Sequence, residues 1–419
     1  MIDNTAVRSH FPALDPSSHG GTAPVYFDNP GGTQIVSEAV AGINEYLVRR
    51  NANHDGAFRA SRESDAMVAD TRAALADFLG ASRPEEICFG QNMTSLTMHL
   101  SRSIARELSP GDELVVTRLD HDANVSPWLL VARDRECVVR WVDFDTSDCT
   151  WSAEALARQV TSRTKLVAVG LASNSTGTIN PVADAARIAR QAGALCFVDA
   201  VHYAPHGPID VTAIGCDFLA CSAYKFFGPH TGILWGRYEL LDRLSAYKVR
   251  PAADTPPHKW ETGTQGFEGI AGLRGALAYL EWLGRTFSAG KGVSRSAALR
   301  SAMKSIQEYE SALCRTMADG LQSVKGLCIK GVVGESRMKN RVPTFSFTLD
   351  GHHPKKICHA LDDAGIFAWD GNYYAPEVTR TLGLEESGGM VRVGAVHYNS
   401  TAEIERLVDA LGAIAKAGE

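Results

Sequence analysis

Two side chains of complementary chemistry follow successive apolar segments in the middle of the chain. Asp199 ends the segment Leu195–Asp199, and Lys225 follows the segment Phe218–Ser222. Aromatic residues and a Gly-Pro turn flank this lysine, so we expect partial desolvation to lower the pKa of its amine and make it nucleophilic. Each residue also has an ordinary structural interpretation. Asp199 could cap a strand end, and Lys225 could lie at the surface. Together they are the nucleophile and the carboxylate that pyridoxal phosphate requires.

Three further polar segments follow strand-like runs and could contact such a cofactor. Thr94 or Ser95 begins a helical pattern, where backbone N–H groups bind phosphate, although either also fits an ordinary helix cap. His121 lies beyond the segment Glu113–Thr117, where an imidazole can stack on a flat ring or serve a structural role. Asn174 could donate a hydrogen bond to a phenolic oxygen or a carboxylate, and its alternative is a polar turn.

These residues need elements that bring them together, and the chain from residue 65 to 236 alternates helical and strand patterns. The alternation predicts an α/β fold in which helices cover both faces of a mostly parallel sheet. Ligands bind at the carboxyl ends of the strands in such sheets, so the polar residues above would share one edge. The predicted strands are Glu86–Phe89, Glu113–Thr117, Val138–Phe144, Lys165–Ala172, Leu195–Asp199, Phe218–Ser222 and Ile233–Trp235.

A change of pattern after Arg250 predicts a second, smaller domain of α+β type, preceded by a proline-rich loop and two long helical patterns. Its expected elements are strands Thr344–Thr348 and Met390–Val393 and helices Pro354–Ala364 and Thr401–Ala415. We divide the chain into an N-terminal arm (1–25), a large cofactor-binding domain (26–270), a linking helix (271–295) and a small C-terminal domain (296–419).

Composition argues against several classes of protein. The 419 residues contain 42 Lys plus Arg and 48 Asp plus Glu, a net charge of −6, without the basic excess typical of nucleic-acid binding. No apolar stretch approaches a membrane span and the N-terminus lacks the apolar block of a signal peptide, so we expect a cytoplasmic protein without a membrane partner. Nine cysteines without paired spacing predict buried thiols and no metal site. The glycine-rich motif of nicotinamide-binding enzymes is missing after the early strands.

The order of several motifs resembles the class V aminotransferase family of pyridoxal-phosphate enzymes, over about residues 25–411. Within it, the similarity is greatest to the cysteine desulfurases and selenocysteine lyases of the second group. The resemblance implies fold type I of PLP-dependent transferases and a homodimer with shared active sites. The motifs are Tyr26-Phe-Asp28-Asn29, His121-Asp-Ala-Asn124, Ser173-Asn174 with Gly177-Thr-Ile-Asn180, Asp199, Ser222-Ala-Tyr-Lys225 with Gly228-Pro229, and Glu261-Thr-Gly-Thr264.

The resemblance implies a role for each matching position. Lys225 is similar to the lysine that binds the cofactor covalently, Asp199 to the partner of the pyridine nitrogen, and His121 to the histidine stacked on the ring; these are the expected catalytic residues. The family usually has a histidine where this chain has Tyr224. The other expected cofactor contacts are Thr94, Ser95, Asn174, His202, Ser222, Tyr224 and, from the neighbouring subunit, Thr264.

The resemblance also implies contacts with an amino-acid substrate. Arg392 and Asn174 are similar to the pair that grips the α-carboxylate, a task that suits arginine because its guanidinium bonds both oxygens. A surface charge at a strand end is the alternative for Arg392. His54 resembles an active-site histidine, although a flexible polar loop is an equally good interpretation.

One loop departs from the family pattern. Where desulfurases of this group have Arg-x-Gly-His-His-Cys-Ala, this chain has Trp369-Asp-Gly-Asn-Tyr-Tyr374-Ala, so Tyr374 occupies the position of the reactive cysteine and joins the expected substrate contacts. A phenol cannot hold a persulfide, so we do not expect the usual sulfur relay.

The leading hypothesis is therefore an enzyme that eliminates the β-substituent of an amino acid, with cleavage of a carbon-sulfur bond. Epimerisation and aminotransfer are the alternatives, and a catalytically inactive relative is a weaker one because Lys225 and Asp199 are both present. The aromatic residues Trp369, Tyr373 and Tyr374 suggest a pocket with more aromatic surface than cysteine needs.

Overall fold

Seven strands form the large sheet that the sequence predicts. The computed structural model describes residues 2–290 and 292–417. The strand order is β2-β8-β7-β6-β5-β3-β4; β8 is antiparallel to its two neighbours and the other pairs are parallel, so the sheet is mostly parallel as predicted. The strands are β2 (Ile87–Gly90), β3 (Glu113–Thr117), β4 (Val138–Val142), β5 (Thr164–Gly170), β6 (Leu195–Asp199), β7 (Phe218–Ser222) and β8 (Gly232–Gly236).

The strand ends that matter for the site agree with the sequence analysis. β3, β6 and β7 are confirmed with unchanged ends, and other ends move by one or two residues. The strand predicted over Lys165–Ala172 ends at Gly170 instead, because residues 171–180 turn back in a loop closed by an isolated bridge between Ala172 and Ile179.

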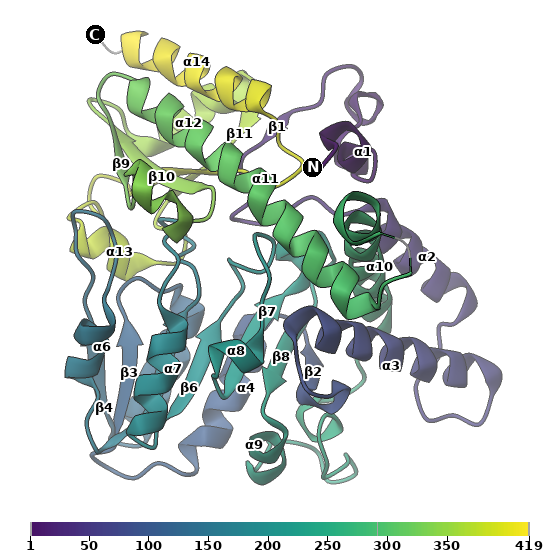
Figure 1. Ribbon diagram of the computed structural model, residues 1–419. Coiled ribbons are helices and arrows are strands. Elements are labelled where there is room, and N and C mark those ends of the chain that lie inside the picture. The colour runs from purple at the N-terminus through teal and green to yellow at the C-terminus, as the bar shows by residue number, and fades with distance from the viewer. Residues whose placement is uncertain (1, 291, 418–419) are drawn as a thin grey trace.

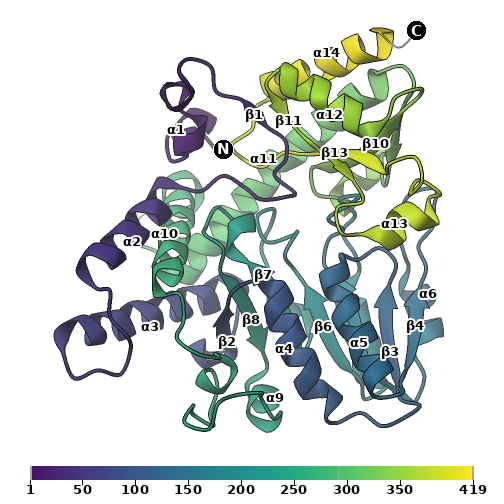
Figure 2. The same cartoon turned by 180° about the vertical axis from the view of Figure 1, so that it is seen from behind.

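Helices cover both faces of this sheet. α4 (Met93–Ala105) and α5 (Ser126–Asp134) lie on one face (Figure 2), and α6 (Ala153–Gln159), α7 (Val182–Gln191) and α8 (Val211–Ile214) lie on the other (Figure 1). Every residue of β3, β7 and β8 is buried, which explains why these strands are apolar on both sides.

A group of long helices lies beside the sheet at its β2 edge. α10 (Phe267–Gly284) packs against α2 (Ser37–Arg49), α3 (Arg59–Leu79) and α11 (Arg295–Ser323). α3 ends as the sequence predicts, with Gly80 in the left-handed region at φ 68°. α11 runs from this group to the second sheet, so it links the two halves of the molecule (Figure 1). The short helices α1 (Asn4–Arg8) and α9 (Tyr238–Arg243) complete this part of the chain.

The C-terminal part is the α+β unit that the sequence predicts, built on an antiparallel sheet of order β12-β13-β10-β9. The sequence analysis missed β9, β12 and the helix α13. The elements are β9 (Leu327–Lys330), β10 (Thr344–Leu349), α12 (Pro354–Asp363), β12 (Trp369–Gly371), α13 (Pro376–Thr381), β13 (Met390–Gly394) and α14 (Thr401–Ala417).

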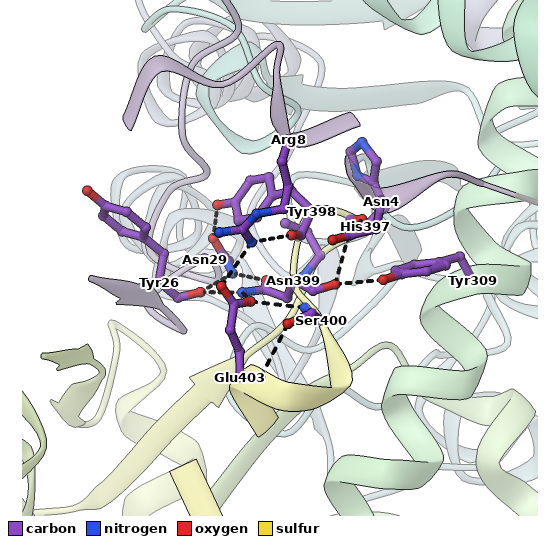
Figure 3. A network of polar contacts seen from close by, with 11 residues as sticks. Asn4, Arg8, Tyr26, Asn29, Tyr309, His397, Tyr398, Asn399, Ser400 and Glu403 are labelled. Carbon is purple, nitrogen blue, oxygen red and sulfur yellow. Dashed lines mark hydrogen bonds and ion pairs between the residues drawn. The ribbon is translucent and has the colours of Figure 1, made fainter. Parts of the chain in front are cut away.

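The N-terminal segment is joined to this C-terminal part. β1 (Val25–Tyr26) pairs in parallel with β11 (Ile366–Phe367). Asn29 Nδ2 donates to the Gly394 carbonyl at 2.8 Å and to Asn399 Oδ1 at 3.0 Å. Figure 3 shows the bond between Asn29 and Asn399 within a larger network that also includes an ion pair of 2.9 Å between Arg8 and Glu403. The division into four segments stays a prediction.

Within the described ranges, no helix is long and apolar enough to span a bilayer. All nine cysteines are unpaired. Most are buried, as predicted; Cys137 and Cys358 are half-buried and Cys328 is exposed.

Candidate active site

A cavity of about 620 Å³ opens at the carboxyl ends of the large sheet's parallel strands. It brings together most of the residues singled out from the sequence, from the segments that follow five different strands. This is the edge that the strand directions predict. The predicted residues that line it are Thr94, His121, Asn174, Asp199, His202, Ser222, Tyr224 and Lys225.

Lys225 lies in the turn after β7, and only 8% of its surface is exposed. Its Nζ donates to the carbonyl oxygens of Pro30 and Gly31, the latter at 3.0 Å. Burial, aided by the positive charge of Arg392, lowers the pKa of the amine to about 7, against opposing effects of the Asp199 and Asp28 carboxylates. Lys225 is therefore the partly deprotonated, nucleophilic lysine that its aromatic neighbours suggest.

This pKa predicts how the amine of the cofactor-free protein reacts. Lys225 should be acylated by a small reagent along a titration with a midpoint near 7, because the amine is protonated and unreactive below that pH and neutral above it. Competitive labelling read by mass spectrometry measures the midpoint, with a free lysine derivative in the same mixture as the control. A midpoint at the ordinary value of about 10 would contradict a desolvated Lys225.

Asp199 ends β6 and is buried at the floor of the cavity. Its Oδ1 accepts a hydrogen bond from the Val201 N–H at 2.9 Å. Burial raises the pKa of Asp199 to about 6, while Lys225 opposes the rise. A buried carboxylate of this kind gains from a cationic partner, so Asp199 suits a protonated ring nitrogen.

A second buried carboxylate, Asp120, lines the same cavity and was missed from the sequence. It accepts from the Gly170 N–H at 3.0 Å and from Asn124 Nδ2 at 2.9 Å. Burial, together with the negative charge of Asp199, raises the pKa of Asp120 to about 7. Its place after a strand end and directly before His121 is the signal that could have found it.

His121 presents a neutral imidazole to the cavity. Burial lowers its pKa to about 4, and Lys225 contributes in the same direction. Its Nδ1 accepts from the Ala123 N–H at 3.0 Å, so the ring proton resides on Nε2. The ring of Tyr374 stacks near it, with centroids 5.8 Å apart and planes 21° apart.

Thr94 and Ser95 differ in their surroundings at the start of α4. Ser95 forms a capping box with Asn92, which occupies its side chain, and it does not line the cavity, so its role as a cofactor contact stays a prediction without support from this placement. Thr94 lines the cavity, and its backbone N–H has no protein acceptor in the described part of the chain. The Met93 N–H donates to Ser222 Oγ at 3.0 Å, which ties this helix start to the end of β7.

Two other predicted contacts, His202 and Tyr224, have protein partners of their own. His202 Nε2 lies 3.1 Å from Thr344 Oγ1, and burial holds the pKa of its imidazole well below the usual value. The Tyr224 ring stacks on His230, with centroids 4.9 Å apart. His230 also lines the cavity and was not singled out from the sequence.

An outer chamber of about 750 Å³ adjoins the cavity and shares Lys225, His121 and Asn174 with it. Arg392 on β13 lines the chamber, so it is not the surface charge that was the alternative. Its Nη1 donates to the Asn174 carbonyl at 2.8 Å, and its guanidinium lies 4.3 Å from the centroid of the Tyr373 ring. Burial lowers the pKa of Arg392 to about 10.

The loop with the unusual tyrosines closes one side of this chamber. Tyr373 and Tyr374 both have left-handed backbones, at φ 56° and 58°, which is uncommon for residues with side chains. Asn174 Nδ2 donates to the Tyr373 carbonyl at 2.9 Å and the Asp122 N–H donates to the Tyr374 carbonyl at 2.7 Å. These two bonds hold the loop against the large sheet's side of the site.

The structure does not bring two predicted residues into either space. His54 lies in an exposed loop, where its Nδ1 is 2.7 Å from Asp55 Oδ2, and lines neither the cavity nor the chamber. Thr264 lines a separate cavity of about 940 Å³ beside the start of α4. A further carboxylate, the half-buried Asp28, was quoted only as part of a motif; desolvation raises its pKa to about 6 against opposing charges on Arg392 and Lys225.

Comparison with known proteins agrees with this geometry. The model of the family described as aminotransferase class V matches residues 25–407. The chain belongs to this family. The class V aminotransferases are dependent on pyridoxal phosphate, so this protein is a PLP-dependent enzyme with the predicted fold.

Several class V relatives cover the whole chain. A probable cysteine desulfurase of Streptomyces coelicolor is 31% identical, over 98% of this chain and 97% of its own length. An aminotransferase-like protein of Gibberella zeae is 30% identical, over 97% and 96%. The solved structure of an apo cysteine desulfurase from Thermococcus onnurineus has a TM-score of 0.87 and 25% identity, over 100% of this chain and 99% of that one.

The residues of this class V enzyme fit the cofactor that the family requires. The cavity offers a nucleophilic lysine, a buried carboxylate whose raised pKa favours a cationic neighbour, and the unpartnered Thr94 N–H at a helix N-terminus. These three groups match the aldehyde, the ring nitrogen and the phosphate of pyridoxal phosphate, in that order.

Proposed function

We propose that the protein is a PLP-dependent carbon-sulfur lyase that removes a sulfur-linked β-substituent from an amino acid. One observation carries the proposal: among the described residues no thiol lines the chamber that joins Lys225 to Arg392, and Tyr374 lines it at the position that the family resemblance assigns to a reactive cysteine. The nucleophile and the carboxylate clamp support amino-acid chemistry, and the missing thiol argues against retention of sulfur on this loop.

In this proposal, the cofactor is held by residues that line the inner cavity. Lys225 would bind it covalently, Asp199 would pair with its ring nitrogen, and His121 would lie on its ring. Thr94 and Ser222 would bind the phosphate. When bound, pyridoxal phosphate supplies an electron sink that stabilises negative charge at the substrate's α-carbon.

The side chains around it perform the remaining tasks. Arg392 binds the substrate's α-carboxylate through its guanidinium, and Tyr373 beneath it fixes the plane of that group. The Lys225 amine, once free, takes the α-proton, and the electron pair of the broken carbon-sulfur bond leaves with sulfur. Overall, an S-substituted cysteine and one water give a thiol, pyruvate and an ammonium ion.

The proposal extends to the oligomeric state, the compartment and the binding partners of the protein. We propose a homodimer in which Thr264 reaches the phosphate of the other subunit, since Thr264 lines a cavity beside α4 and not its own chain's cavity. The nine unpaired cysteines support a reducing compartment such as the cytoplasm. A small amino acid is the proposed partner, without nucleic acid or membrane.

A product assay tests the lyase. The holoenzyme is incubated with L-cysteine or S-methyl-L-cysteine, and we expect pyruvate, ammonia and free sulfide or methanethiol in equal amounts, because no thiol in the chamber can retain sulfur. Mass spectrometry of the protein should find all nine cysteines unmodified. A stable persulfide on one cysteine, lost together with activity when that cysteine becomes serine, would replace the lyase with a desulfurase. Racemised or transaminated product without pyruvate would favour the epimerase or aminotransferase alternatives.

A further inference from the structure

The outer chamber is far larger than a thiol requires. Its volume of about 750 Å³ lies within the range of pockets that hold drug-sized ligands, roughly 300 to 1,000 Å³. A cysteine side chain beyond its β-carbon is a single sulfur atom, which would occupy only a small part of this space. The residues that line the chamber therefore indicate what kind of group fills it.

One wall is the indole of Trp369, which packs closely against a glycine. A Cβ at Gly31 would lie 2.6 Å from Trp369 Nε1, closer than real contacts allow, so the indole packs directly on the glycine backbone. Trp369 is the register partner of Arg392 in neighbouring antiparallel strands, and such partners point to the same face of a sheet. The indole thus stands beside the residue that would bind the α-carboxylate.

A second wall is the ring of Tyr374. It is 75% exposed, although it stacks near His121, and its left-handed backbone is pinned through its carbonyl to the Asp122 N–H. Strained backbone of this kind persists where the surroundings over-determine it, most often at functional sites. The backbone of the loop is thus held in place, and the loop presents a mostly exposed aromatic ring near His121.

The rest of the chamber's described lining is mixed in chemistry. Besides the aromatic rings and the residues already given cofactor or carboxylate roles, it consists of Met98, small residues and the polar side chains of Asp122, Ser126, Asp370 and Asn372, and it contains no cysteine. Rings separated by a chamber of this size favour a planar guest, since aromatic pairs gain from offset-stacked and edge-to-face contact.

From these walls we propose that the substrate carries a planar aromatic or heteroaromatic ring on its β-sulfur, held between Trp369 and Tyr374. The assignment of the sulfur rests on the proposed lyase function; the assignment of the ring rests on the chamber alone. The reaction is the balanced elimination given above, with an aryl thiol as the leaving product. An aryl thiolate leaves more readily than sulfide or an alkyl thiolate, because its conjugate acid is stronger.

The experiment compares S-phenyl-L-cysteine with S-cyclohexyl-L-cysteine, two side chains of similar size of which only the first is planar. L-Cysteine is the third probe. Titration of the holoenzyme's visible absorption gives a dissociation constant for each probe whether or not the carbon-sulfur bond breaks, and pyruvate release gives kcat/KM. We expect S-phenyl-L-cysteine to bind about 3- to 10-fold more tightly than the cyclohexyl compound, the effect of one or two ring contacts.

Two variants and a control locate the effect. Trp369→Ala and Tyr374→Ala should each reduce the preference for the phenyl compound towards unity, while Trp369→Phe keeps most of it. Both side chains are more than half exposed, at 51% and 75%, so neither change should unfold the protein. Tyr238→Ala removes an aromatic ring at the start of α9, at the opposite end of the large sheet from the site (Figure 1), and should leave the preference intact.

The outcomes separate the two proposals. Equal or tighter binding of the cyclohexyl compound or of L-cysteine, or a phenyl preference that survives both alanine variants, would overturn the aromatic assignment and leave the lyase standing. A phenyl preference in the absorption titration without pyruvate from any probe would support the ring and overturn the lyase.

Discussion

Lys225→Ala should abolish turnover and remove the visible absorption that depends on covalently held cofactor. The amine is both the point of attachment and the base that takes the α-proton, and loss of a general base alone reduces rates by about 100- to 10,000-fold. Cofactor absorbance of the purified variant and pyruvate release under saturating substrate measure the two roles separately. A small primary amine added to the variant should restore part of the activity, because the cavity left by the side chain admits it.

Lys259→Ala is the matched control for this variant. Lys259 is 7% exposed, against 8% for Lys225, and its Nζ likewise donates to a backbone carbonyl, that of Asp242 at 2.6 Å. It lies outside the cavity and the chamber, so absorption and turnover should persist. If Lys225→Ala retained the absorption band and full activity, the assignment of the nucleophile would be wrong.

Arg392→Ala should weaken binding of amino-acid substrates by about 30- to 5,000-fold, the equivalent of about 2 to 5 kcal/mol for loss of one partner in a buried, charged pair. The absorption of bound cofactor should change little, because Arg392 lies in the outer chamber with its guanidinium against Tyr373. The dissociation constants come from absorption titrations. Arg392→Lys should restore only part of the affinity, since an ammonium cannot bond both carboxylate oxygens.

Arg341→Lys provides the comparison for Arg392→Lys. Arg341 is 5% exposed and its guanidinium lies 3.6 Å from the centroid of the Phe345 ring, a setting much like that of Arg392. It bonds backbone carbonyls and lines neither space of the site, so its replacement should lower thermal stability and leave substrate affinity unchanged. Equal substrate affinity in wild type and Arg392→Ala would show that another residue binds the carboxylate.

Much of the site was predictable because it depends on strand direction. Apolar runs buried on both faces identify parallel strands, and the residue after each run must lie at one edge of the sheet. Asp199, His121 and Lys225 come together for this reason. Thr94 and Ser95 were not separable, because both fit a helix start and only the register of the cap at Asn92 decides which side chain is used.

The residues that were missed or misplaced depend on contacts between distant parts of the chain. β12 has three residues, too few for a periodic pattern, yet its pairing with β13 sets Trp369 beside Arg392. Tyr373 contributes through the contact of its ring with the Arg392 guanidinium, and no local sequence pattern reveals that contact. His54 was taken from a resemblance between whole enzymes and lines neither space of the site. Thr264 was expected to act from the neighbouring subunit, so its place outside its own chain's site leaves that prediction open.

The pairing of β1 with β11 has a consequence for the order of events on the ribosome. Val25 emerges 341 residues before its partner Ile366. At about 5 to 20 residues per second, β1 waits roughly 17 to 70 s for the strand that completes it. The apolar residues Val25, Tyr26 and Phe27 therefore stay exposed during synthesis, while the large sheet can already assemble. In a ribosome-bound chain stopped before residue 366, this segment should be accessible to chaperones and proteases. It should become protected once the full chain is released and β1 pairs with β11.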